Sequence, residues 1–332
     1  MFTYVVRRIL VSIPLLILIS IIIFIILNNM PGGPLAPYLQ NPHITPADIE
    51  RLRANLGLTP PHGVPQPVWD CIRYFKWLGH VVTGDFGYSV SESRPVLESI
   101  LGHMPATLEL MGTSLFFALV FGIAAGIFSA VRPYSFADYL ITTLAFFGQS
   151  MPVFWFALML QLAFAVHGIP LPGGYEIRLP SASISSSDTF DLGDRIQHLI
   201  LPVIVLSLFN LAVFSRFMRS SLIEVTRTDY VRTAAAKGLD PRTILFKHEM
   251  KNALMPVVTV LALTMPSLVG GAVLTETLFA WPGAGRMFIN ALGQGDIALL
   301  LAYLMLSAFV VVFANIAADI VYAWLDPRVS YE

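Results

Sequence analysis

The chain has 332 residues, of which 56% are hydrophobic and 12% carry a charge, and its mean hydropathy is +0.71. Soluble domains carry about 25% charged residues, so this chain lacks the polar side chains to cover a water-soluble globule, and lipid surroundings are indicated. The formal net charge of −1 gives no overall field that favours nucleic acid or acidic ligands. The single cysteine, Cys71, excludes an internal disulfide and a cysteine-based metal site.

The first segment joins basic residues to a long apolar run. Arg7 and Arg8 precede the apolar residues 9–27, a pattern shared by signal peptides and transmembrane helices. The run is close to the ~20 residues that a span needs and exceeds the ~7–15 of a signal peptide. Residues 28–31 also lack a small-x-small cleavage site. We therefore predict a retained N-terminal transmembrane helix over 1–30.

Apolar runs long enough to span a membrane recur along the chain. The sequence therefore predicts an all-α polytopic membrane protein with about six transmembrane helices. In the second run Gly122, Gly126 and Ala130 recur at every fourth position, a spacing that lets two helices approach closely and that ordinary packing also explains. The six runs are 9–28, 107–131, 138–166, 199–219, 254–278 and 298–324.

Lysine and arginine are denser in the segments that lie inside if the N-terminus is cytoplasmic, so we predict both termini in the cytoplasm. An extracytoplasmic insertion is then expected over 31–104, with helices near 46–56 and 67–78. Residues 167–198 are rich in Pro, Gly and Ser and predict an irregular loop. A core with five further spans is predicted over 105–325, including a cytoplasmic loop at 220–253, and a cytoplasmic tail over 326–332.

The most informative part of that loop begins at Asp229. We predict that Asp229 caps a short helix over 230–237, which contains three consecutive alanines. Gly238 supplies the left-handed conformation that closes many helices. After Leu239, Asp240 is predicted as a second N-cap with Pro241 at the first helical position. The second helix then runs from residue 242 into the membrane near residue 254.

The small residues and cations of this helix–turn–helix allow two interpretations. One is a rigid docking helix for a cytoplasmic partner, and the other is a solvated basic loop beside lipid headgroups. The residues alone leave both open.

The run Asp229-Tyr-Val-Arg-Thr-Ala-Ala-Ala-Lys-Gly238 resembles the EAA loop of ABC-importer permeases, and most closely that of the dipeptide/oligopeptide subfamily. Arg232 and Thr233 stand where the general family pattern has Glu and Ala. The resemblance extends along nearly the whole chain, and the first helix with its long outside segment resembles the B-type permease. The further matching segments are 7–14, Met30–Pro34, Gly84–Ser89, Pro105–Leu110, Ser150–Phe154 and Glu276–Gly285.

This resemblance implies a type I ABC-importer permease fold in the bacterial inner membrane and import of di- or oligopeptides by alternating access. It implies four kinds of partner: a second permease, two ATP-binding subunits, an extracytoplasmic peptide-binding protein and the lipid membrane. It also implies that this chain binds no cofactor itself, and that ATP and magnesium are bound by the partner subunits. The ATPase-coupling loop would comprise Asp229, Tyr230, Arg232, Thr233, Ala234, Ala235, Lys237, Gly238, Leu239 and Asp240.

A translocation path between two permeases would use polar or flexible positions of the third and fifth helices, although a kinked packing interface explains them equally well. Proline at 152 and 266 would free backbone carbonyls, which a membrane helix tolerates only where another group bonds them. The candidates are Gln149, Ser150, Pro152, Gln161, Pro266, Ser267, Gly270, Gly271 and Glu276.

Other activities lack their signatures. The sequence contains no Gly-x-x-x-x-Gly-Lys-Ser/Thr, so ATP binding by that route is excluded, and no His-Glu-x-x-His or Gly-x-Ser-x-Gly indicates an enzyme. Two alternatives remain: a permease for a nickel chelate, glutathione or another small solute, and an ion-coupled secondary transporter. The second would need ion-coupling groups inside the membrane, for which the candidates are Glu276, Asp138, and Asn315 with Asp319 on one helix face. Most of them are expected to be structural, and Glu276 is the exception to test.

Overall fold

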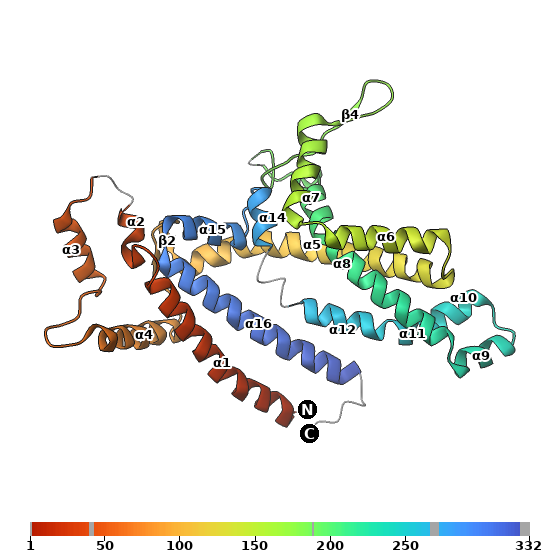
Figure 1. Ribbon diagram of the computed structural model, residues 1–332, viewed down its shortest axis with the longest axis horizontal. Coiled ribbons are helices and arrows are strands. Elements are labelled where there is room, and N and C mark those ends of the chain that lie inside the picture. Colours follow the sequence, from red (N-terminus) through yellow and green to blue (C-terminus); the bar gives the residue numbers. More distant parts are fainter. Residues whose placement is uncertain (1, 40–42, 188, 266–271, 326–332) are drawn as a thin grey trace. The chain divides into compact units, whose positions relative to one another are not determined.

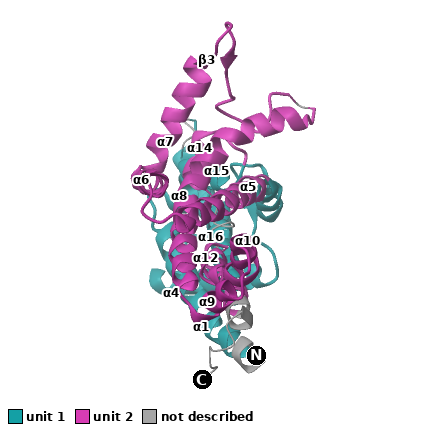
Figure 2. Ribbon diagram, turned by 90° about the vertical axis from the view of Figure 1, so that its right-hand side faces the viewer, with its two compact units in different colours: residues 1–105, 283–316 teal, residues 106–282, 317–332 magenta. Residues whose placement is uncertain are grey.

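The computed structural model describes residues 2–39, 43–187, 189–265 and 272–325, and these are mostly helical (Figure 1). The chain divides into two compact units, which are coloured separately in Figure 2. The first unit combines residues 1–105 with 283–316, and the second combines 106–282 with 317–332. The sequence-based domain boundaries follow the order of the chain, whereas the first unit joins its N-terminal third to a segment near its C-terminus.

The first unit is built around the long apolar helix α1 (Phe2–Asn28). One end of α1 packs through Phe24 and Leu27 against Tyr74 and against the apolar side chains of 299–303. The predicted helices of the insertion are confirmed as α3 and α4. Besides α1, the unit contains η1 (Gly33–Leu35), α2 (Ala36–Leu39), α3 (Pro46–Asn55), α4 (Gln66–Val82), β1 (Tyr88–Ser89), β2 (Arg94–Pro95), the start of α5 (Val96–Val131), α15 (Ala284–Gln294) and the larger part of α16 (Ile297–Leu325).

A buried carboxylate joins distant segments of this unit. Asp296, which is 1% exposed, accepts hydrogen bonds from the Ser89 hydroxyl at 2.7 Å and from the backbone N–H and hydroxyl of Ser91, each at 2.9 Å. It also accepts from the N–H of Leu299 in the first turn of α16 at 3.2 Å. The antiparallel pair β1–β2, in which Tyr88 faces Pro95, is thereby held at the beginning of α16.

The second unit is organised by α8 (Leu192–Thr226), which contacts α6, α7, α11, α12 and α14. α8 begins seven residues before the expected span because Asp191 caps it by accepting from the N–H of Gly193 at 2.9 Å. Its other elements are α6 (Phe136–Ser150), α7 (Val153–Leu160), the π-helix η2 (Gln161–His167), β3 (Ile169–Pro170), β4 (Glu176–Ile177), α9 (Asp229–Ala236), α10 (Pro241–Thr243), the π-helix η3 (Ile244–Glu249), α11 (Met250–Ala253), α12 (Met255–Thr264) and α14 (Val273–Leu278).

Four helices of the described residues are long and apolar enough to cross a membrane: Val6–Asn28, Val96–Val131, Leu192–Thr226 and Ile297–Asp319. The pair Phe136–Ser150 and Val153–His167 passes the same test only when its two helices are taken together. In the expected span 254–278, α12 covers ten residues and residues 266–271 lie outside the described part. The count of six spans therefore stays a prediction.

The expected span over 138–166 is divided into two helices that meet at an angle of 104°, at Pro152, one of the two prolines that the sequence marks as able to kink a helix. Pro152 has no N–H to continue the helix and disfavours helical geometry in the residue before it. Met151 is accordingly extended, with ψ of 135°, and its N–H closes α6 by bonding Phe147 O at 3.2 Å. The helical conformation resumes in α7, which runs in a new direction.

Two of the matching segments of the sequence meet inside the second unit. The hydroxyl of Thr107 donates to Glu276 Oε1 at 2.8 Å, and the indole N–H of Trp281 donates to Ala106 O at 2.8 Å. Trp281 and Glu276 are both fully buried. The guanidinium of Arg195 lies 5.3 Å from the Trp281 ring and forms a bidentate pair with Glu109. Residues 106–107 and 276–281 are therefore connected by hydrogen bonds between buried polar groups.

A second set of polar contacts fixes α6 on α8. Asp138, which is 2% exposed, accepts from Nε and Nη2 of Arg219, both at 2.7 Å, and from the backbone N–H of Tyr134 at 2.8 Å. The hydroxyl of Ser135 caps the same helix by accepting from the N–H of Asp138. Asp138 thus joins the beginning of α6 to α8 through Arg219.

The predicted close approach of two helices is confirmed for α5 and α8. A Cβ atom placed on Gly122 would lie 2.8 Å from Phe214 Cβ, and one placed on Gly126 would lie 2.6 Å from the Ser215 carbonyl oxygen. Both distances are shorter than a van der Waals contact, so the close packing of α5 on α8 requires glycine at these two positions. Gly112, about three turns before Gly122 on α5, has open space where its Cβ would lie.

This difference gives a matched test. Gly126→Ala should lower the free energy of unfolding by about 1–3 kcal/mol, because the methyl group must displace backbone of α8. Gly112→Ala should leave it unchanged or raise it by up to about 1 kcal/mol through helix propensity. Thermal unfolding of both variants in the same detergent measures the difference, and equal transition temperatures would contradict the packing account.

Candidate functional site

The predicted coupling segment is a short helix, a turn and a second helical stretch, as expected from the sequence. One detail of the prediction is wrong: Asp229 is the first residue of α9 and Thr228 occupies the N-cap position. The hydroxyl of Thr228 forms no cap for α9 because it donates to Val225 O at 2.6 Å, at the end of α8. Asp229 still lies in the first turn of α9, where a negative charge favours the helix dipole.

The predicted turn is confirmed in atomic detail. Gly238 has φ of +78°, its N–H bonds Ala235 O at 3.0 Å, and the next N–H, of Leu239, bonds Ala234 O at 3.4 Å. This pair of bonds is a Schellman motif, which satisfies the last carbonyls of α9. Asp240 then caps α10 by accepting from the N–H of Thr243 at 3.0 Å. Hydrogen bonds from the side chain and, second, from the backbone of Thr243 lower the pKa of Asp240.

Helix α9 has a buried face and an exposed face. Val231 and Ala234 are three residues apart and pack against Ile244 of η3 and Val225 of α8. This small cluster holds the two helical stretches together. The exposed face carries Asp229, Tyr230, Arg232, Thr233, Ala235 and Lys237, and the turn beyond it exposes Gly238, Leu239 and Asp240.

A hydrogen bond ties α9 to the stretch that leads away from it. Asn252 Nδ2 donates to the Tyr230 hydroxyl at 2.8 Å. α9 is thus connected to η3 through Val231 and to α11 through Tyr230. Helix α11 in turn contacts α8 and α12. A push on the exposed face would therefore reach the membrane helices of the same unit.

An open cavity of about 490 Å³ lies between α9 and η3 and extends to the ends of α5 and α8. Arg232 and Arg242 line it together with the apolar side chains of Val231 and Leu245. Glu249, 7% exposed, also borders this cavity, and its burial raises its pKa, against a smaller opposing effect from a hydrogen bond with Thr226.

The candidate translocation residues fall into separate surroundings. Gln149 Oε1 accepts from Arg216 Nη2 at 2.7 Å and borders a cavity of about 200 Å³ between α6 and α8. Ser150 donates to Phe146 O at 2.8 Å within its own helix, and Pro152 lies at the bend between α6 and α7. Positions 149–152 thus adjoin one another around that bend.

Two other candidates lie in the packed region near α14. Gln161 donates to Ser181 O at 2.9 Å and to Leu278 O at 3.0 Å, and Glu276 is enclosed beside Thr107. Pro266, Ser267, Gly270 and Gly271 lie outside the described residues. The translocation path therefore stays a prediction.

Sequence reasoning missed Val231, Ile244, Asn252 and Glu249. The three-residue spacing of Val231 and Ala234 is a signal of an inward face, and the pairing of Tyr230 with Asn252, 22 residues away, has none in a single sequence. Within the described part of the chain, no group of three His, Cys, Asp or Glu side chains could hold a metal ion.

Comparisons with known proteins show the family of the chain. Residues 122–331 match the family model of the binding-protein-dependent transport system inner membrane component, and residues 1–111 match the model of its N-terminal part. The chain is 41% identical over 333 residues to an oligopeptide transport system permease protein of Bacillus subtilis, with both chains fully covered. It is 35% identical over 346 residues to a dipeptide transport system permease protein of Escherichia coli K12, again with full coverage of both.

Among solved structures, the chain is similar to two crystal forms of the methionine ABC transporter MetNI in inward-facing conformations. The TM-scores are 0.50 and 0.52 at 17% and 18% identity, and the matches cover 69% of this chain and 97% and 96% of the other chains. This likeness confirms the predicted type I ABC-importer permease fold.

The buried carboxyl of Glu249 leads to a pH-dependent prediction. Its raised pKa means that the folded protein holds this proton more tightly than the unfolded chain, so wild-type stability is full at low pH and falls as the pH rises through the folded-state pKa. Glu249→Gln removes that loss. We expect the variant to melt at a higher temperature than wild type at pH 8 and to differ less at pH 5. A gap that does not grow with pH would contradict the assignment.

Proposed function

We propose that this chain, which belongs to the family of binding-protein-dependent transport system inner membrane components, forms half of the membrane pore of an ATP-driven importer of di- or oligopeptides. Chemistry on the cargo is not part of this role. The full-length relatives whose names state oligopeptide or dipeptide transport support the cargo class.

The observation that carries the proposal is the conformation of α9 with its turn at Gly238. An eight-residue helix capped by a Schellman turn presents a face of polar and small side chains, while Val231 and Ala234 fix its other face to the rest of the unit. Such a part is too small to hold a core of its own, and its rigidity is suited to transmitting a displacement. We infer that this face docks on an ATP-binding subunit.

The assembly that we propose contains this chain, a second homologous permease, two ATP-binding subunits and an extracytoplasmic peptide-binding protein. ATP and magnesium are held by the ATP-binding subunits and not by this chain. Both termini and α9 face the cytoplasm, as the lysine and arginine distribution favours. Closure of the ATP-binding subunits moves α9, and the two permeases alternate between inward-open and outward-open states, because ATP binding favours one of them.

Coupling through α9 can be tested at its turn. Gly238 and Gly57 both have positive φ, +78° and +62°, and both have open space where a Cβ would lie. Replacing either by Asp carries the same backbone cost of about 1–2 kcal/mol, which is about a tenfold change in a conformational population. We expect Gly238→Asp to reduce ATP-dependent uptake and binding-protein-stimulated hydrolysis by about tenfold, whereas Gly57→Asp, located after α3, should leave both unchanged.

The measurement uses the complete complex in proteoliposomes, with the amount of assembled complex determined for each variant. Full coupling in Gly238→Asp, or equal loss in the two variants, would refute the role of α9. Uptake by this chain alone under an ion gradient, with no ATP-binding subunit present, would replace the proposal by a secondary transporter.

The cargo is tested separately, by identifying what the complex imports. Labelled di- and oligopeptides should accumulate on addition of ATP, and unlabelled peptides should compete with them. Accumulation of a nickel chelate or glutathione, with no competition by peptides, would overturn the peptide assignment and leave the coupling mechanism intact.

A further inference from the structure

Helix α4 of the first unit has three distinct faces. Tyr74 is buried, and Trp77 and Leu78 pack with it against the apolar cluster that includes Phe24 of α1. A second face carries Trp69, Arg73, Lys76 and His80 and borders a cavity. The third face is apolar and exposed: Val68, Ile72, Phe75 and Val82 lie along it with Gly79, and Phe75 and Val82 are 68% and 79% exposed. Water is a poor solvent for such a continuous apolar stripe.

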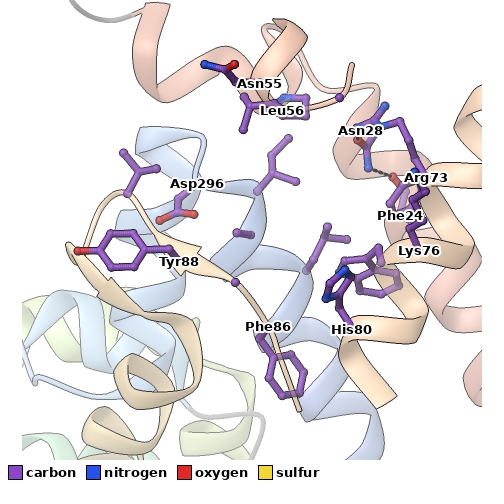
Figure 3. A pocket seen from close by; sticks show the side chains of 18 of the residues that line it. Phe24, Asn28, Asn55, Leu56, Arg73, Lys76, His80, Phe86, Tyr88 and Asp296 are labelled. Carbon is purple, nitrogen blue, oxygen red and sulfur yellow. Dashed lines mark hydrogen bonds between the residues drawn. The ribbon is translucent and has the colours of Figure 1, made fainter. Parts of the chain in front are cut away.

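Contacts with α1 fix the level of α4 along that helix. The Tyr74 hydroxyl and the Ser20 hydroxyl are 2.8 Å apart, and the Phe24 ring lies 5.5 Å from the Tyr74 ring and 5.6 Å from the Trp77 ring. Arg73 Nη2 donates to Asn28 Oδ1 at 2.8 Å (Figure 3). α4 therefore crosses α1 between Ser20 and Asn28.

That level falls within the candidate span of α1. Residues Val6–Asn28 of α1 form a candidate span, and Asn28 marks its polar end. Ser20 is eight residues before Asn28, which corresponds to about 12 Å along a helix. Half of a hydrocarbon core of about 30 Å is about 15 Å, so the crossing falls between the headgroups and the middle of the bilayer.

The exposed stripe of α4 resembles the exposed side of α1, because both carry large apolar side chains. At the same level of α1, Ile22, Ile25 and Ile26 are exposed by 47–59%. These side chains of a membrane span meet acyl chains. A neighbouring helix at the same level that exposes Ile72 and Phe75 meets the same solvent.

The second face of α4 has the composition of a membrane–water boundary. Lys76 Nζ lies 5.2 Å from the Trp69 ring and makes no ion pair with any part of the chain that the structure describes, and Arg73 lies one turn before it. Figure 3 shows Arg73, Lys76 and His80 along one side of an open cavity of about 730 Å³. Tryptophan rings and lysine side chains that reach from apolar surroundings to polar headgroups are typical of this zone.

We propose that α4 is an interfacial membrane helix: its stripe of Val68, Ile72, Phe75 and Val82 is covered by acyl chains of the leaflet at the C-terminal end of α1, and Lys76 reaches the phosphate groups above. Amphipathic helices of this kind lie about 5–10 Å deep at the headgroup–acyl boundary. The insertion between α1 and α5 is thereby attached to lipid. This inference requires only that α1 spans the membrane and is independent of the cargo and of the ATP-binding subunits.

Cys71 in α4 is the only cysteine of the chain, so its replacement allows a label to be attached at one chosen position. In a Cys71→Ser background, a nitroxide label is placed at Phe75→Cys or, as a control, at Arg51→Cys on α3, where the native side chain is 79% exposed. The full chain, alone and in its co-purified complex, is incorporated into nanodiscs of phosphatidylethanolamine and phosphatidylglycerol. Collision of the label with oxygen, which concentrates in lipid, is compared with collision with a water-soluble nickel chelate by electron paramagnetic resonance.

At Phe75→Cys we expect the ratio of oxygen to nickel collisions to be several times that at Arg51→Cys, in the chain alone and in the complex. A ratio equal to that of the control would show that the stripe faces water and would overturn the proposal. A label at Phe75→Cys that is shielded from both reagents in the complex would show that another subunit covers the stripe, and would overturn it as well.

Discussion

Lipid offers no hydrogen bonds, so each polar group that a membrane protein carries into the hydrocarbon needs a partner from the protein itself. The second unit meets this requirement at a few polar contacts. Trp281 donates to the carbonyl of Ala106 in α5, and Glu276 accepts from Thr107. Asp138 accepts from two guanidinium N–H groups of Arg219. Leaving a buried polar group without its partner costs about 1–3 kcal/mol, so the helices are held in register by interactions that lipid cannot replace.

The same constraint explains the close contact of α5 and α8. Lipid solvates apolar side chains as well as another helix does, so helix association in the membrane depends on close packing and not on the hydrophobic effect. Gly122 and Gly126 remove the side chains that would separate the two backbones. Helix α9 and its turn are stabilised in a different way. They are built from local caps, the Schellman turn at Gly238 and the Asp240 cap, with one small apolar cluster to fix α9 to α8 and η3.

The sequence predicted these local features well because each depends on nearby residues. Gly238, Asp240 with Pro241, and the close-packing glycines of α5 all behave as their types and spacings indicate. Asp229 was assigned the wrong capping position, because the sequence does not show that Thr228 donates its hydroxyl to the end of α8. The sequence marks Pro152 as a possible kink but not the angle of 104°, since a proline in a membrane helix is compatible with a continued helix when neighbouring groups compensate. Contacts such as Tyr230–Asn252 and Ser20–Tyr74 depend on the tertiary arrangement, which single-sequence periodicity does not contain.

The central claim is that the exposed face of α9 touches an ATP-binding subunit. The most direct measurement replaces Ala235, which is exposed on that face, by a photoreactive phenylalanine derivative in the assembled transporter, with Arg51 replaced in the same way as the control. The account predicts that irradiation joins position 235 to an ATP-binding subunit and that position 51 gives no such product. An intact complex in which position 235 forms no link to an ATP-binding subunit would contradict it.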